Sequence, residues 1–152
     1  MITFHVESWS DVWREMEPHW KGHWEEVAMN RDTILLDPDI EAYNAMERVG
    51  GLHIVVAREA GALVGYHISL VRPHLHYRND LHAFTDLYYI AKSHRKGSAG
   101  VRLFKEVERT LKARGVVKMF TGTKLSLDMS RIFEYLGWTE TERLFTKYIR
   151  KE

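Results

Sequence analysis

The segment from Asp86 to Gly115, DLYYIAKSHRKGSAGVRLFKEVERTLKARG, constrains the fold more than any other part of the chain. It joins an apolar run of strand character to a basic loop and then to an amphipathic helix ended by Gly115. The helix is predicted from four apolar residues at helical spacing, Leu103, Phe104, Val107 and Leu111. A loop that opens a helix presents unpaired backbone N–H groups at the positive end of the helix dipole, where an anion can bind. The segment therefore predicts a phosphate-binding turn between a strand and a helix.

The loop itself has the composition of such a turn. Gly97 and Gly100 allow the backbone to approach a ligand closely, and Arg95 and Lys96 add positive charge beside them. The simpler alternative is a strand-to-helix bend in which the glycines only make the turn and the basic side chains are solvated. Both interpretations stay open on this segment alone.

Composition indicates one compact domain spanning residues 1–152, because 45% of the residues are hydrophobic. A net charge of +1 gives no broad attraction to nucleic acid or to acidic membranes, so we expect neither as a partner. The absence of cysteine excludes a disulfide framework and a thiolate nucleophile. No apolar run is long enough to cross a bilayer, and the start of the chain lacks the pattern of a secretion signal, so we expect a cytoplasmic protein.

The order of predicted elements gives the fold class. Strands are predicted at residues 2–6, 52–59, 62 to about 72, 81–91, 116 to about 122 and 144–149. The first helix is predicted from a cap at Ser8 or Ser10 to about Met29, with an interruption at Pro18. The second is predicted from Asp37–Pro38 to Met46. Two more are predicted over residues 100–115 and 130–136. A longer connection, RPHLHYRND, is expected between the third and fourth strands. Interleaved helices and strands predict an α/β sandwich with a mixed sheet.

Three segments together resemble the GNAT superfamily of acetyl-CoA-dependent N-acyltransferases. The loop RKGSAG, residues 95–100, can be aligned with the family's Q/R-x-x-G-x-G/A motif from Arg95, the register we prefer, or from His94. The segment EAGALVGYHISLV, residues 59–71, is similar to the family's central hairpin, and SRIFEYLGW, residues 130–138, to its late helix. The residues HLHY after the third predicted strand, together with RKGSAG in the loop, look most like short enzymes of bacteriophages and prophages.

The resemblance implies an α/β/α sandwich whose mostly antiparallel central sheet is splayed where acetyl-CoA binds. It places the diphosphate of acetyl-CoA on the loop and first helical turn, Arg95, Lys96, Gly97, Ser98, Ala99, Gly100 and Val101. It places the pantetheine arm against main-chain groups of Tyr89, Ile90 and Ala91, where a backbone N–H directed at the thioester oxygen can assist transfer. Phe133 then packs against the arm, and a homodimer is common in the family.

The reaction also requires movement of protons. An amine with a reference pKa of ~10.4 arrives as an ammonium ion and must lose a proton. Asp86 is the first candidate for the base and His82 the second; both lie on the strand beside the reaction centre and share one face with Phe84 and Tyr88 if no bulge intervenes. Asp86 can equally bind the substrate's ammonium group or hold a loop amide. The tyrosine that many relatives use as the acid is replaced by Phe133, so Ser130, one turn earlier, is the candidate for relaying a proton through water.

Other residues are candidates for contacts with the acceptor. The resemblance directs His74, His76 and Tyr77 toward the acceptor side, and Trp24 of the first helices can form part of the pocket wall, although core packing is the commoner use of a tryptophan. Histidine pairs such as His19 and His23 have spacings that zinc can use, but no acidic or cysteine partner accompanies them, so we expect no metal.

We therefore expect an N-acetyltransferase that passes the acetyl group of acetyl-CoA directly to an amine of a small molecule or a protein in a ternary complex. The direct route is favoured because no cysteine is present to form an acyl-enzyme. One alternative is a catalytically weakened module that binds CoA and has a regulatory role, which the Phe133 substitution favours. Another is a structural or partner-binding protein without a cofactor. The sequence leaves the acceptor open.

Overall fold

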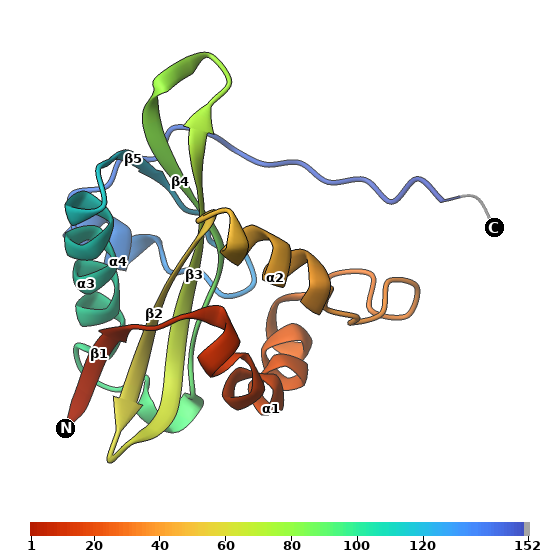
Figure 1. Cartoon of the computed structure of the whole chain (residues 1–152). Helices are drawn as coiled ribbons and strands as arrows, with labels where there is room; N and C mark the ends of the chain where they lie inside the picture. The colour runs from red at the N-terminus through yellow and green to blue at the C-terminus, as the bar shows by residue number, and fades with distance from the viewer. Residues whose placement is uncertain (151–152) are drawn as a thin grey trace.

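A five-stranded sheet organises the chain, in a computed structural model that describes residues 1–150 (Figure 1). The strands are β1 (Ile2–Val6), β2 (Leu52–Glu59), β3 (Ala62–His74), β4 (Tyr77–Ile90) and β5 (Val116–Phe120), and they lie in this order across the sheet. The first four pair antiparallel, and β5 pairs parallel with β4. The mixed, mostly antiparallel sheet predicted from the sequence is confirmed.

Helices cover both faces of this sheet (Figure 1). Helices α1 (Trp9–Val27) and α2 (Ile40–Arg48) pack on one face, and α3 (Ala99–Ala113) and α4 (Ser130–Tyr135) on the other. A short 3₁₀ turn, η1 (Lys92–His94), joins β4 to the loop before α3. Two apolar cores result, one beneath α1 and one beneath α3. None of the helices described has the length and apolar character needed to span a membrane.

The start of α1 is fixed by a residue distant in sequence. Ser8 is the N-cap, as the sequence suggested, but its side chain makes no capping hydrogen bond. The Glu47 carboxylate of α2 accepts instead from the backbone N–H groups of Trp9 and Ser10. The Trp9 ring is 1% exposed and stacks on Tyr43 with 4.2 Å between centroids. The Glu47 cap and the stack of Trp9 on Tyr43 therefore hold the start of α1 against α2.

The predicted interruption at Pro18 is wrong, because α1 continues through it. A proline inside a helix removes one hydrogen bond and costs about 3 kcal/mol. Burial of Trp9, Val12 and Met16 on the sheet offsets this cost, since each buried side chain of this size contributes ~1.5 to 3 kcal/mol. Tertiary packing overrides the local preference here.

The predicted start of the second helix was also misplaced. The N-cap of α2 is Asp39, whose carboxylate accepts from the Ala42 N–H at 2.9 Å, and not Asp37. Asp39 directly precedes the first helical residue, Ile40, which is where a capping side chain reaches the free N–H groups.

The expected long connection RPHLHYRND does not exist as a loop. Strands β3 and β4 extend into it and form a projecting hairpin closed at Leu75 and His76, with His74 paired to Tyr77 (Figure 1). The sequence pattern missed these strand ends because the hairpin extends beyond the helices, and most of its residues are exposed and polar.

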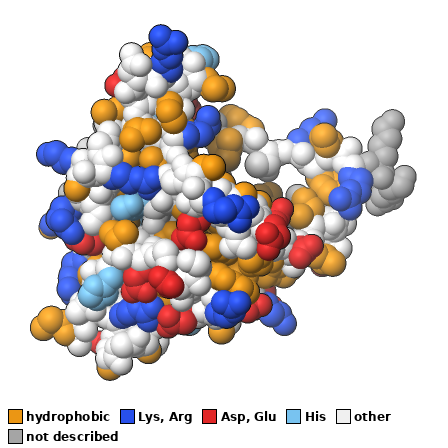
Figure 2. All heavy atoms as spheres, in the orientation of Figure 1, with side chains coloured by type: hydrophobic (Ala, Val, Ile, Leu, Met, Phe, Trp, Pro, Cys, Tyr) orange, Lys and Arg blue, Asp and Glu red, His pale blue; other side chains and the backbone are white. Residues whose placement is uncertain are grey.

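The predicted last strand, residues 144–149, is likewise wrong. Residues 139–150 are exposed and form neither helix nor strand. Leu144, Phe145 and Ile149 are 91%, 89% and 81% exposed. Figure 2 shows hydrophobic side chains along this segment where it leaves the body of the protein.

Candidate active site

Strands β4 and β5 diverge and leave a gap in the sheet. They pair only between Leu81 and Phe84 of β4 and between Val116 and Phe120 of β5, whereas β4 continues to Ile90. From Thr85 onward, the edge of β4 that faces β5 has no strand partner among residues 1–150. This edge leads directly to η1 and the glycine-containing loop.

Gly65 allows β4 to lie unusually close to β3 at the end of this edge. A Cβ atom at Gly65 would lie 2.7 Å from the Tyr89 carbonyl oxygen and 3.2 Å from the Ile90 Cα. Real Cβ atoms do not approach other atoms so closely, so the position requires glycine. Gly65 therefore determines where the last residues of β4 lie.

The main-chain groups of these last residues face different ways. The Ala91 N–H donates to the Val64 carbonyl at 2.8 Å, and the Tyr89 carbonyl lies against Gly65, so both point toward β3. Main-chain groups alternate between the two edges of a strand. The groups of Ile90 and Tyr88 therefore lie on the edge that faces the gap, and the Ile90 carbonyl accepts from Arg95 Nε at 2.8 Å.

The loop before α3 presents free backbone donors. Gly97 has a φ of +75°, which favours glycine, and α3 begins at Ala99 after the N-cap Ser98. The backbone N–H groups of Lys96 to Val101 find no hydrogen-bond acceptor within the described chain. Gly100 contributes close packing, because a Cβ atom there would lie 3.2 Å from the Ile132 side chain of α4. Free N–H groups at a helix N-terminus, with little side-chain bulk, fit a diphosphate.

Arg95 is not a free cation beside this loop. Its guanidinium forms a two-point ion pair with Glu26 of α1, with distances of 2.7 and 2.9 Å, and lies 5.7 Å from the centre of the Tyr89 ring. Its hydrogen bond holds the pKa of the Glu26 carboxyl below its usual range. Arg95 thus ties the end of α1 to β4, and Lys96 is the exposed cation nearest the free N–H groups.

A bulge at Asp86 separates the side chains of β4 into two groups. Ser69 pairs with Thr85 and Ile68 with Leu87, so Asp86 is the extra residue. The side chain of Asp86 meets α2, whereas the Tyr88 ring packs on the opposite face. The bulge that the sequence analysis allowed for therefore intervenes, and Tyr88 does not share a face with Asp86.

Asp86 is exposed and accepts a hydrogen bond from the Tyr43 hydroxyl of α2. Burial first and the Asp86 carboxylate second raise the pKa of the Tyr43 phenol above its ordinary value. Tyr43 therefore stays a hydrogen-bond donor and orients the carboxylate. His82, the second candidate, lies on the same strand but is buried at 5% exposure, with its ring 4.9 Å from that of His74.

Tyr88 is a candidate that the sequence analysis missed. Its hydroxyl donates to the Gly122 carbonyl at 2.9 Å and so spans the gap, and its ring packs against Phe104 and Phe133. Burial raises the pKa of the Tyr88 phenol. Phe133 is buried beside it, 9% exposed, and the Ser130 hydroxyl at the start of α4 donates to Asp128 at 3.0 Å. An aromatic residue in an apolar strand gave no signal of this position.

The expected acceptor contacts lie in two places. His74, His76 and Tyr77 lie together at the end of the β3–β4 hairpin, where their rings are within 5.2 to 6.4 Å of one another. Trp24 lies on α1, half-buried. The same helix also brings His19 and His23 to within 5.4 and 5.2 Å of the Tyr89 ring, contacts that the sequence did not reveal.

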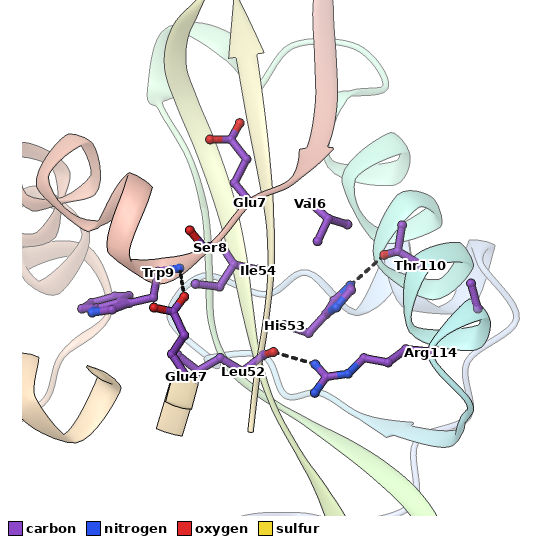
Figure 3. A pocket seen from close by; sticks show the side chains of 11 residues that line it. Val6, Glu7, Ser8, Trp9, Glu47, Leu52, His53, Ile54, Thr110 and Arg114 are labelled. Carbon is purple, nitrogen blue, oxygen red and sulfur yellow. Dashed lines mark hydrogen bonds between the residues drawn. The ribbon is translucent and has the colours of Figure 1, made fainter. Parts of the chain in front are cut away.

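Cavity volume by itself does not locate the site. A cavity of about 640 Å³ lies between β2, the start of α1 and the end of α3 (Figure 3). Its polar side chains already have hydrogen-bond partners within the chain. Glu47 accepts from the Trp9 N–H, His53 pairs with Thr110, and Arg114 donates to the Leu52 carbonyl. It adjoins the end of α3 opposite the loop, about 20 Å away by helix length. A second hollow of about 560 Å³ lies between the end of β4 and α1, where it is lined by Tyr89, Lys92 and Glu26 among others.

Metal binding has no geometric support in the part of the chain described, where no three His, Cys, Asp or Glu side chains converge in a ligating arrangement. The absence of a metal stays a prediction.

The chain belongs to the acetyltransferase (GNAT) family, whose model matches residues 9–138. The family resemblance seen in the sequence is thereby confirmed, while the bacteriophage branch stays a prediction. Enzymes of this family use acetyl-CoA, and the chain is an acetyl-CoA-dependent N-acetyltransferase. A search of curated proteins found no match.

Solved structures of similar fold include three acetyltransferases of distant sequence. An aminoglycoside acetyltransferase from an uncultured soil metagenomic sample is 16% identical with a TM-score of 0.75, over 99% of both chains. A ribosomal-protein-alanine N-acetyltransferase from Brucella melitensis biovar Abortus 2308 is 15% identical with a TM-score of 0.70, over 99% of both chains. A predicted acetyltransferase with acetyl-CoA from Clostridium acetobutylicum is 11% identical with a TM-score of 0.70, over 97% of this chain and 96% of that one.

We predict that Gly65→Ala weakens both the fold and CoA binding. The added methyl group must displace Tyr89 and Ile90, and overpacking of this kind costs about 1 to 3 kcal/mol. Thermal unfolding and calorimetric titration with CoA measure the two effects. Gly22→Ala is the control: nothing lies within 4 Å of a Cβ atom there, and because Gly22 is inside α1 this variant should be at least as stable as the unaltered protein. A Gly65→Ala protein with unchanged melting temperature and CoA affinity contradicts the role of Gly65 in placing the last residues of β4.

Proposed function

We propose that this acetyltransferase passes the acetyl group directly to a primary amine in a ternary complex, at the gap between β4 and β5. The observation that carries the proposal is the run of backbone N–H groups from Lys96 to Val101 that have no acceptor within residues 1–150, next to the edge of β4 that has no strand partner there. When bound, acetyl-CoA supplies a thioester whose acyl group is the one transferred.

The chain's part in binding divides between backbone and side chains. The N–H groups of Lys96 to Val101 and the Lys96 ammonium hold the diphosphate. The gap-facing N–H groups of Tyr88 and Ile90 and the Tyr88 carbonyl pair with the pantetheine amides. Tyr89 and Ala91 support them from the β3 side, and Phe133 provides apolar contact. Positioning two reactants in this way can contribute ~7 to 11 kcal/mol, so most of the rate enhancement requires no special side chain.

Two side chains on opposite faces handle protons. Asp86, oriented by Tyr43, accepts the proton of the incoming ammonium group directly or through water. His82 is buried and about 13 Å from Asp86 along the strand, which disfavours it as the base. Tyr88 lies beside Phe133 and donates a proton to the departing thiolate, a role for which Ser130 and a water molecule are the alternative.

The acceptor is an amine of a small molecule or of a protein. Structures of similar fold include an aminoglycoside acetyltransferase in complex with sisomicin and the ribosomal-protein-alanine enzyme, so both acceptor types occur on this architecture. A second candidate function is a CoA-binding regulatory module, which the apolar Phe133 favours by removing the usual acid from α4.

Release of free thiol from acetyl-CoA across a panel of amines separates these functions. The proposal predicts turnover with at least one amine and acetylated product by mass spectrometry. CoA at ~100 times its dissociation constant should also add about 2.7 kcal/mol to the free energy of unfolding. Stabilisation by CoA without turnover favours the module, and no stabilisation contradicts both functions.

Substitutions at Asp86 and at Tyr88 should change kcat differently as the pH is raised. Asp86→Asn should lower kcat by ~100- to 10,000-fold at neutral pH, with recovery as the pH approaches the pKa of the acceptor amine, because the amine then arrives uncharged. Tyr88→Phe should lower kcat without that recovery and leave the KM for acetyl-CoA unchanged. Rate profiles against pH measure both effects. An Asp86→Asn protein with the kcat of the unaltered protein across this pH range contradicts the role of Asp86 as the base.

We also propose a homodimer formed through the C-terminal segment. Leu144, Phe145 and Ile149 are exposed, and within the described chain the outer edge of β5 has no strand partner. A free edge with unpaired backbone groups accepts an added strand, here residues 144–149 of a second copy.

Light scattering should give the mass of two chains, and Leu144→Asp with Phe145→Asp should give one. A single-chain mass for the unaltered protein at all concentrations contradicts the dimer.

A further inference from the structure

Three cation-forming side chains form a row across the sheet at the base of the hairpin. Arg72 of β3 pairs with His82 of β4, and His82 pairs with Lys118 of β5. Side chains of directly paired residues project from the same face and lie about 5 Å apart at Cβ. Across residues 1–150, neither Arg72 nor Lys118 forms an ion pair. A row of like charges on neighbouring strands is destabilising unless an anion accompanies it.

His82 forms the buried centre of this row. It is 5% exposed, and its Nδ1 atom has no hydrogen-bond partner in the described chain. The His74 ring lies 4.9 Å away, and that of Phe120 5.8 Å away. A buried polar atom without a partner costs about 1 to 3 kcal/mol, so a ligand that pairs with it offsets a real penalty.

The side chains of the row also affect the pKa of His74. Burial first, and then the nearby basic side chains His82, His76, Arg72 and Lys118, lower the pKa of His74. Arg72 and Lys118 are themselves exposed, on either side of the buried His82. Figure 2 shows basic and histidine side chains exposed around the projecting hairpin.

Aromatic rings hold the two mobile cations in position. Phe84 and Phe120 stack with 4.8 Å between centroids. The Arg72 guanidinium lies 5.0 Å from the centre of Phe84, and the Lys118 ammonium lies 5.1 Å from the centre of Phe120. Cation–π contacts at this distance fix side chains that otherwise sample many rotamers. Arg72 and Lys118 therefore each have a preferred position beside this aromatic pair.

The row lies on the same strand face as Asp86. His82, Phe84 and Asp86 alternate along β4 before the bulge, which puts the Asp86 carboxylate about 13 Å from the row by strand length. The aromatic pair lies between them. The Asp86 end of this surface therefore suits an ammonium group, and the end formed by the row suits a negatively charged group.

We propose that Arg72, His82 and Lys118 bind a carboxylate or phosphate group of the acceptor, so that the substrate is an amine bearing an anion at its far end. This assignment rests on the proposed acetyl transfer at Asp86. It excludes a polycation such as an aminoglycoside as the preferred acceptor, because that molecule would place positive charge against the row.

The first test compares acceptors that differ only in the far charge. ω-Amino carboxylates of increasing chain length are each matched by their primary amide, and aminoalkyl phosphates form a separate arm that distinguishes carboxylate from phosphate. We expect kcat/KM to be at least about tenfold higher for an anionic acceptor than for its neutral match. Arg72→Gln with Lys118→Gln should abolish this preference and leave kcat/KM for the amide unchanged. Lys21→Gln with Lys112→Gln removes the same charge elsewhere and should leave the preference intact.

The second test does not depend on turnover. Inorganic phosphate and acetate are titrated separately while the ring signals of the histidines are followed by NMR. We expect a saturable shift of the His82 signal that is absent from the Arg72→Gln, Lys118→Gln protein.

The two tests fail independently of the proposed function. Turnover without an anion preference, or an unresponsive His82 signal, overturns the anion site alone. Failure of acetyl transfer with every amine, together with a saturable His82 shift, supports the anion site and overturns the proposed function.

Discussion

The early end of pairing between β4 and β5 is the constraint on which the site depends. Pairing stops at Phe84, and within residues 1–150 the next six residues of β4 have no strand partner on this edge. In an intact sheet these backbone groups would be hydrogen-bonded to a neighbouring strand, with no room for a ligand. Gly65 holds β4 against β3, and the Tyr88 hydroxyl spans the gap to the Gly122 carbonyl. The gap is therefore a defined structure with fixed walls.

The bulge at Asp86 gives the gap two chemically different sides. Before it, β4 directs His82, Phe84 and Asp86 toward one face; after it, Tyr88 points to the other, against Phe104 and Phe133. A regular strand would place Asp86 and Tyr88 on the same face. One inserted residue thus separates a carboxylate, which can accept a proton, from a phenol, which can donate one.

Local signals in the sequence predicted the parts of the fold that local physics determines. The apolar spacing from Leu103 to Leu111 located α3, and Gly97 and Gly100 located the loop with its free N–H groups. Pro18 misled because its cost is offset by packing that no local window reveals. The bulge was outside the reach of pattern reasoning for the same reason, since it depends on the register between β3 and β4. The ion pair between Glu26 and Arg95 joins residues far apart in the chain, so the loop motif alone suggested a phosphate contact for Arg95.

The most direct measurement of the central claim is a backbone amide NMR titration of the intact chain with CoA. The account predicts that the largest shifts fall on the amides of Lys96 to Val101 and on those of Tyr88 and Ile90, with only small changes around His53 and Thr110 in the cavity of Figure 3. Shifts concentrated at that cavity, with the amides from Lys96 to Val101 unchanged at saturation, would contradict it.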